Sequence, residues 1–328
     1  MEKILVLICI FGASITGFSQ NSKALKLYNE AISILQEGEE SMAISKLEQA
    51  LDIDSNFIKA RYNLGLLYRE MQRLDLADKH FSAIIRLQPT FPKAYVLRGK
   101  IRLEAMRLQD ALNDFVLATQ MFPYDYDAWH GLGSVHFMYE NYEGAEEFFT
   151  KALQIFPEFP ACLNDRASAR MMLEKWTLAG EDYKSAVLFM PENARYRNNL
   201  GLFLFKTNKL NEAIEQFKKA REIGDELEVS SNMLLLCHIA QDKELPDSLV
   251  NGSPMFDLNA ANAYVFQNQT EKALQLNAQA ATENDPNFKD YQCLQKIRIF
   301  ISENRFEEAC MEIPKCNTAL EYKKLVCR

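Results

Sequence analysis

The chain has 328 residues, 48% of them hydrophobic, and its 37 basic and 45 acidic residues give a formal net charge of -8 at pH 7. A chain of this length can bury a large apolar core. The acidic balance, without a long basic run, excludes a mainly electrostatic nucleic-acid binder, because phosphate binding requires a concentrated basic face.

The N-terminus has the three parts of a secretory signal peptide. The charged start MEK is followed by the apolar run ILVLICIFG and then by the small and polar stretch ASITGFSQ. Residues 4–18 are fewer than the ~20 that span a bilayer. We therefore predict a cleaved signal over residues 1–19 rather than a membrane anchor, and no stable membrane span after cleavage. Cys9 follows a bulky isoleucine, so lipid anchoring is not expected.

A repeat of 34 residues organises the next two hundred positions. An alanine recurs at Ala43, Ala77, Ala111, Ala145, Ala179 and Ala213. A bulky residue follows each alanine by four positions, a small residue precedes it by twelve, and a proline follows four of the six by twelve. Small residues let two helices approach closely, and proline ends the second helix. The pattern predicts helix-turn-helix units that stack into an all-α solenoid.

This pattern resembles the tetratricopeptide-repeat (TPR) family, with W-x2-L-G-x2-Y, then A-x3-F, then P. The fourth repeat matches it most fully, at Trp129, Leu132, Gly133, Ala145, Phe149 and Pro157, with His136 in the tyrosine place. The resemblance implies a right-handed superhelical solenoid with six regular units, at 24–57, 58–91, 92–125, 126–159, 160–193 and 194–227.

After the sixth unit the period weakens. Residues 228–252 read as a degenerate repeat followed by a turn-rich loop. Ala273 and Ala309 then resume the pattern 36 residues apart. We predict two degenerate units over 253–328, closed by a capping helix.

The stretch AWHGLGSVHFMYENYEGA, residues 128–145, raises the question of a metal or phosphate site. His130 and His136 are six residues apart and point about 120° from one another on a helix, so they cannot easily share an ion. The GxG lacks a preceding strand and a third glycine, and the chain has no P-loop or nucleophile elbow. We predict a protein that is not an enzyme and that holds no metal or cofactor.

The family resemblance implies that the first helices line a concave groove for a protein or peptide partner. The groove positions are 2, 5, 6, 9, 12 and 13 of each unit. The residues that stand at these positions in this chain include the following: in units two and three, Lys59, Tyr62, Asn63, Arg69, Lys93 and Lys100; in units four and five, His130, Ser134, Phe137, Met138, Asn164, Met171 and Met172; and in unit six, Arg195, Asn198, Asn199 and Phe205. The predicted groove residues of units two and three are basic and polar, whereas those of units four to six are mainly apolar with amide side chains.

Two features of this groove bear on how it would hold a ligand. Asparagine recurs at position 6, where its amide either holds a ligand's backbone or satisfies neighbouring helix groups. The resemblance does not extend to the clamp with which chaperone-binding members hold a terminal carboxylate. Its positions are occupied here by Tyr28 and Ile32 in unit one, Asn63 in unit two, and Lys93 and Leu97 in unit three, so that only the middle of the clamp remains.

Four cysteines fall in the last 36 residues. The segments EEAC and KLVC resemble the end of exported bacterial repeat proteins, and we predict a disulfide between Cys310 and Cys327. Cys293 with Cys316 is a second candidate pair, and the alternative is that all four are buried thiols.

The start and end of the chain resemble envelope proteins of Bacteroidota-type bacteria. We therefore expect an exported, periplasmic or cell-surface scaffold that binds a protein or peptide partner in envelope assembly or secretion. The alternatives are a module that binds a small molecule or glycan, and an accessory subunit of an enzyme encoded elsewhere.

Overall fold

The computed structural model describes residues 22–224, 233, 237, 270–279, 286–302 and 305–316. The predicted signal, most of the predicted loop region 228–252, the capping helix after residue 316 and Cys327 lie outside these residues. The chain divides into two units, residues 1–173 and 174–328, and each is described by itself.

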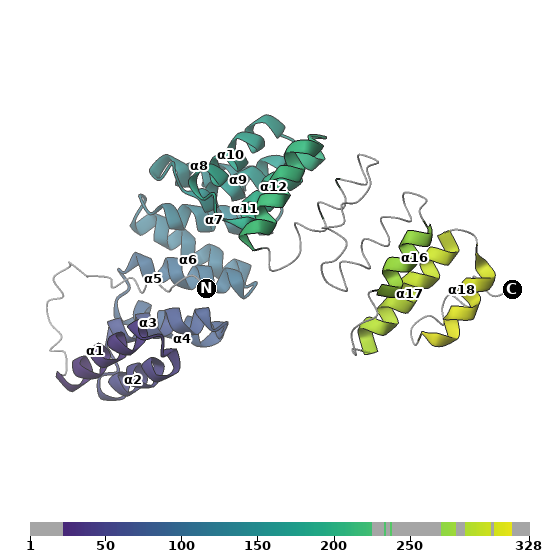
Figure 1. Cartoon of the computed structure of the whole chain (residues 1–328). Coiled ribbons are helices and arrows are strands. Elements are labelled where there is room, and N and C mark those ends of the chain that lie inside the picture. Colours follow the sequence, from purple (N-terminus) through teal and green to yellow (C-terminus); the bar gives the residue numbers. More distant parts are fainter. Residues whose placement is uncertain are drawn as a thin grey trace. The chain divides into compact units, whose positions relative to one another are not determined.

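The first unit is a tandem series of helices (Figure 1). They are α1 (Ser22–Gln36), α2 (Glu40–Ile53), α3 (Ile58–Glu70), α4 (Leu74–Leu87), α5 (Pro92–Glu104), α6 (Leu108–Met121), α7 (Tyr126–Met138), α8 (Tyr142–Ile155) and α9 (Pro160–Met172). The odd-numbered helices are the first helices of the repeats, and the even-numbered ones are the second helices.

The second unit continues this order. It contains α10 (Trp176–Phe189), α11 (Ala194–Lys206), α12 (Leu210–Ile223), α16 (Thr270–Gln279), α17 (Pro286–Ser302), α18 (Phe306–Glu312) and the short 3-10 helix η1 (Ile313–Lys315). The fold is the predicted all-α solenoid of helix-turn-helix units. Ala273 and Ala309, which resume the period, are fully buried in α16 and α18.

The turn inside each regular repeat needs one residue in the left-handed backbone region. The first turn uses Gly38, with φ 85°. The other five turns place a residue with a side chain there, at φ 58–60°: Gln72, Met106, Glu140, Glu174 and Asn208. These positions are 34 residues apart, so the turn geometry repeats with the sequence period.

The GxG of the fourth repeat is explained by packing. Gly131 and Gly133 lie against the rings of Phe115 and Phe149, and a methyl group at either glycine would overlap those rings. Both phenylalanines are almost completely buried. These glycines therefore let a second-helix aromatic ring touch the backbone of a first helix, and they do not form a phosphate loop.

Charged pairs replace apolar packing in alternate repeats. Position 7 of the repeats reads Glu30, Leu64, Arg98, Leu132, Arg166 and Leu200. Lys46 donates a hydrogen bond to Glu30 at 2.7 Å, and Arg98 donates two to Asp114, at 2.9 and 2.6 Å. The sign of the pair is reversed between repeats one and three, and the chain thus has a second period of two repeats.

Arg98 belongs to a buried network that joins repeats two and three. Its guanidinium also donates to Ser82 at 2.9 Å. Arg102 donates to Asp78 at 2.7 Å and to Asp114 at 2.9 Å. The Asp114 side chain is only 2% exposed, so its charge depends on these guanidinium groups for compensation.

Candidate partner-binding face

Contacts between basic and acidic side chains connect the successive first helices of the first unit. Arg69 on α3 pairs with Glu104 on α5, Lys93 and Lys100 on α5 pair with Asp127 on α7, and His130 on α7 contacts Asp165 on α9. In every case the base comes from one repeat and the acid from the next. These contacts bring four of the predicted groove residues, Arg69, Lys93, Lys100 and His130, next to acids of the following first helix. We call the side of α3, α5, α7 and α9 that carries the predicted groove positions the first-helix face.

The centre of this face is the carboxylate of Asp127. The ammonium groups of Lys93 and Lys100 donate to its two oxygens, each at 2.8 Å. Burial raises the pKa of Asp127, but the two lysines lower it more and bring it to about 2. Burial lowers the pKa of Lys93, and the Asp127 charge reverses this shift and raises it above the ordinary lysine value.

His130 lies in a more apolar part of the face. Its Nε2 is 2.8 Å from Asp165, and its ring centroid lies 5.5 Å from Phe149 and 5.0 Å from Phe159. The amide of Asn164 donates to the other oxygen of Asp165 at 3.1 Å. His130 thus links two repeats through a carboxylate.

The two asparagines predicted for the groove of the first unit are largely buried, Asn63 being 8% and Asn164 4% exposed. In the second unit, Asn198 on α11 is 9% exposed. The Asn63 amide nitrogen donates to the Tyr28 hydroxyl of the preceding repeat at 3.3 Å. For Asn63, this contact fits the reading in which the amide bonds to a neighbouring helix, and the reading of the other position-6 asparagines stays a prediction.

The apolar part of the face lies at the ends of α7 and α9. Met138 is 42% exposed and Met172 is 49% exposed, whereas Met171 and Phe137 are half-buried. Ser134 donates its hydroxyl to the backbone oxygen of His130 at 3.0 Å. Thioether side chains at the surface can adapt to a partner's shape because they are flexible and polarizable.

The remaining predicted residues lie in the second unit, on α11. Arg195 is exposed and its guanidinium lies 5.6 Å from the ring centroid of Tyr196. Phe205 and Asn199 are half-buried.

The sequence analysis did not identify several residues that shape the face. The acids Glu104, Asp127 and Asp165 follow their basic partners by 27 to 35 residues. A search for opposite charges one repeat apart would have found most of these pairs. Phe57, Phe91 and Phe159 each precede a first helix and pack on the aromatic ring at position 5 of the same repeat, with centroids 5.0–6.5 Å apart.

His136 behaves as a packing residue. Its ring lies 4.8 Å from that of Phe148, and its Nδ1 is 3.1 Å from the Asn141 amide. Burial lowers the pKa of His136, and the nearby Glu147 opposes this only in part. Within the described ranges, no three His, Cys, Asp or Glu residues come together as a metal site.

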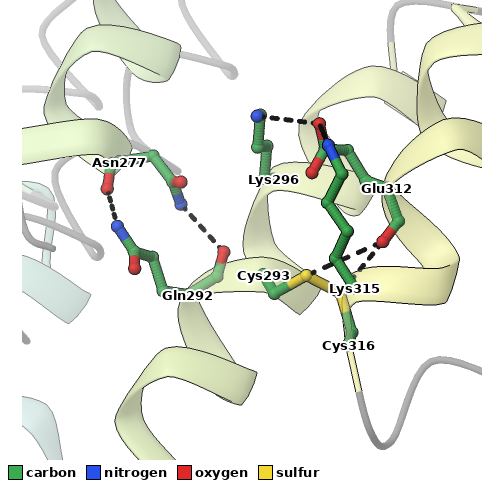
Figure 2. The surroundings of a disulfide bond; sticks show 7 residues. All are labelled: Asn277, Gln292, Cys293, Lys296, Glu312, Lys315 and Cys316. Carbon is green, nitrogen blue, oxygen red and sulfur yellow. Dashed lines mark hydrogen bonds and ion pairs between the residues drawn. A yellow bond between two sulfur atoms is a disulfide. The ribbon is translucent and has the colours of Figure 1, made fainter. Parts of the chain in front are cut away.

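The described part of the C-terminal region contains one cysteine pair with both members in view, Cys293 and Cys316 (Figure 2). Their Cα atoms are 5.7 Å apart, within the normal range for a disulfide. Both sulfur atoms also lie near the backbone oxygen of Glu312, and these contacts are not hydrogen bonds because disulfide sulfurs carry no proton. The second candidate pair of the sequence analysis is thus formed.

Polar contacts surround this disulfide. Glu312 accepts hydrogen bonds from Lys296 at 2.9 Å and Lys315 at 3.0 Å, and Figure 2 shows both lysines reaching the same carboxylate. Asn277 on α16 and Gln292 on α17 exchange amide-to-backbone hydrogen bonds. Cys310 is also disulfide-bonded, and its pairing with Cys327 stays a prediction because Cys327 lies outside the described residues.

Comparisons with known proteins agree with this architecture. Three family models described as tetratricopeptide repeat match residues 58–91, 126–159 and 193–224. The chain contains tetratricopeptide repeats.

Solved TPR proteins share the fold at low sequence identity. PilW, a type IV pilus biogenesis factor, has a TM-score of 0.58 at 16% identity, covering 65% of this chain and 99% of its own. A tetratricopeptide repeat protein from Parabacteroides merdae has 0.55 at 15%, covering 84% and 99%. PilF of Pseudomonas aeruginosa has 0.55 at 17%, covering 65% and 97%. At such identities the likeness shows the fold alone.

One curated relative is the probable assembly chaperone of rpl4 from Emericella nidulans. It is 34% identical over 83 residues, which are 24% of this chain and 22% of that relative. The TPR chain therefore spans about a fifth of that relative. Among the residues that the structure describes, no helix combines the length and apolar character needed to cross a membrane.

Proposed function

We propose that this TPR protein is a non-catalytic scaffold that holds a segment of a partner protein along its first-helix face. The observation that carries the proposal is the series of side-chain contacts joining the first helices: ion pairs from α3 to α5 and from α5 to α7, and the His130–Asp165 contact from α7 to α9. These bonds fix the spacing of the first helices and so present a preorganised surface, which lowers the entropic cost of binding.

The exposed methionines supply apolar contact area beside these charged residues. Met138 and Met172 sit at equivalent positions of successive repeats, and both remain more than two-fifths exposed. A peptide lying across α7 and α9 would cover both and would thus bury apolar surface, which is the main favourable contribution to association.

We further propose that the protein works in the cell envelope, outside the reducing cytoplasm. The signal-like first 19 residues support export. The Cys293–Cys316 disulfide supports it as well, because disulfides persist in oxidising compartments. Cell fractionation tests this part: recovery of the mature protein in the cytoplasm with reduced cysteines would contradict it.

Affinity capture with matched variants tests the scaffold proposal. Met138→Glu and Met172→Glu place a charge on the first-helix face at exposed positions. Leu117→Glu is the control, because Leu117 is 43% exposed on the second helix α6. We expect the two face variants, but not the control, to lose a defined protein from an envelope extract while all three unfold like the parent. Equal capture by all the variants would refute the proposal.

A further inference from the structure

We propose that Tyr126, Phe156 and Phe159, together with Glu158, bind an arginine side chain of the partner protein. The three rings, which we call the aromatic triad, come from the start of α7 and from the loop between α8 and α9. This inference rests on the proposed function and adds the chemical class of one partner residue. None of the four residues stands at a predicted groove position.

The triad is a compact cluster of rings. The Tyr126 centroid lies 5.1 Å from the centroid of each phenylalanine. The centroids of Phe156 and Phe159 are 5.8 Å apart, and their planes differ by 20°. A cation is attracted to an aromatic ring within about 6 Å of its centroid, and with these separations a single cation can lie within that distance of all three rings. Phe156 is 38% exposed, so a partner's side chain can reach the cluster.

The repeat does not need the triad in order to fold. The 34-residue period gives five other sets of equivalent positions, and none of them holds three aromatic residues. These sets are Ala24, Asp54 and Phe57; Ile58, Gln88 and Phe91; Pro92, Phe122 and Asp125; Pro160, Met190 and Asn193; and Ala194, Gly224 and Leu227. All five repeats still form both of their helices. The rings of the fourth repeat are therefore available for binding.

The charges beside the triad leave a negative excess. Lys93 and Lys100 are bonded to Asp127, and Asp125 also attracts Lys93, so two lysines are balanced by two carboxylates. Glu158 is exposed and makes no ion pair with any other residue that the structure describes. Charge complementarity therefore favours a cation of the partner at this site.

A guanidinium group fits this combination better than an ammonium group does. It is planar and weakly hydrated, and it stacks on aromatic faces. Its N–H groups, which lie at the edge of the plane, also bond to carboxylates. Glu158 belongs to the same loop as Phe156 and Phe159, so one arginine can meet both the rings and the carboxylate.

His130 connects the triad to the first-helix face. Its ring centroid lies 5.0 Å from that of Phe159, and its Nε2 contacts Asp165 on α9. His130 itself stands at a predicted groove position. A peptide that lies along the first-helix face at α7 and α9 thus passes next to the triad, and one of its side chains can extend onto the rings.

The experiment uses the mature chain and labelled peptides, with fluorescence anisotropy as the readout. The probe is an acetylated and amidated peptide of Gly, Ser and Leu that carries one central arginine. The comparison peptide has citrulline in its place, which keeps the shape of the side chain and removes its charge.

Two variants and a matched control are measured with both peptides. Phe156→Leu removes a ring of the triad, and Glu158→Gln removes the exposed charge. Phe122→Leu is the control, because Phe122 stands at the position of Phe156 in the preceding repeat, is 50% exposed and lies outside the triad. Glu158 is an exposed loop residue, so the result for its variant does not depend on how well Phe156→Leu folds.

We expect the arginine peptide to bind the parent protein at least about fivefold more tightly than the citrulline peptide at low salt. Phe156→Leu should remove most of this advantage. Glu158→Gln should reduce it about two- to threefold and weaken its dependence on salt. Phe122→Leu should leave it unchanged.

Equal binding of the two peptides, no binding of either, or an equal loss in Phe122→Leu would overturn the arginine site. An arginine advantage that both Phe156→Leu and Glu158→Gln leave intact would overturn its assignment to the triad. Citrulline-peptide binding that Met138→Glu abolishes, without any arginine advantage, would leave the scaffold proposal intact while the arginine site fails.

Discussion

Removal of the Asp114 carboxylate should cost more stability than removal of any exposed charge. Asp114 accepts three hydrogen bonds from Arg98 and Arg102, and its side chain is 2% exposed. In Asp114→Ala, Arg98 keeps only its bond to Ser82. Breaking a buried ion pair from one side typically costs about 3–5 kcal/mol, because a buried charge is left without compensation.

The chain itself offers the compensating variant. At the positions of Arg98 and Asp114, the next repeat has Leu132 and Phe148. The double change Arg98→Leu and Asp114→Phe introduces this apolar pair. We expect it to recover at least half of the free energy of unfolding that Asp114→Ala loses, because both buried charges are removed at once.

Urea unfolding followed by circular dichroism, with hydrogen exchange to localise the loss to α4–α6, measures these effects. Glu215→Gln is the matched control because its ion pair with Lys219 is exposed, and it should leave the transition unchanged. The reasoning is refuted if Asp114→Ala unfolds at the same urea concentration as this control.

Three further changes test other parts of the structure. Gly133→Ala should lower the free energy of unfolding by up to about 2 kcal/mol, because overpacking against the Phe149 ring costs about 1–3 kcal/mol and the better helix propensity of alanine returns ~1 kcal/mol. A raised melting temperature would contradict the close packing. Burial lowers the pKa of His80 to about 4. The free energy of unfolding should therefore be unaffected by His80 above its unfolded pKa near 6.5 and should fall as the pH drops from there to 4, because only the unfolded chain then binds the proton. His80→Phe should remove this pH dependence from urea unfolding measured at a series of pH values, and a pH profile identical to the parent's would exclude His80 as its source. Reduction of the Cys293–Cys316 disulfide should speed hydrogen exchange in α17 and α18 and leave the first unit unaffected; unchanged exchange in those helices would show that the bond is not needed there.

The fold could be predicted from the sequence because its determinants recur in fixed columns. Gly133 and Phe149 touch in the structure, and each belongs to a column that the 34-residue period reveals. The turn residues, such as Met106 at φ 58°, were not foreseen, because a methionine carries no local preference for the left-handed region.

The pairing of the charged residues on the candidate face could not be predicted from the sequence. Lys93 and Lys100 were identified as basic groove residues, but their attachment to Asp127 depends on how far α5 lies from α7. Such distances follow from tertiary packing and not from the spacing along one helix. The pairing of Cys293 with Cys316 depends in the same way on how α17 and α18 fold together, so it remained one of two candidates.

Site-specific photo-crosslinking in the source cells tests the central claim, that the first-helix face holds the partner, most directly. A photoreactive amino acid is placed at Met138, at Met172 or at Leu117, three positions with similar exposure. The account predicts that the first two positions form an adduct with one and the same protein, whereas Leu117 does not. An adduct formed only from Leu117, or none from Met138 and Met172, would contradict it.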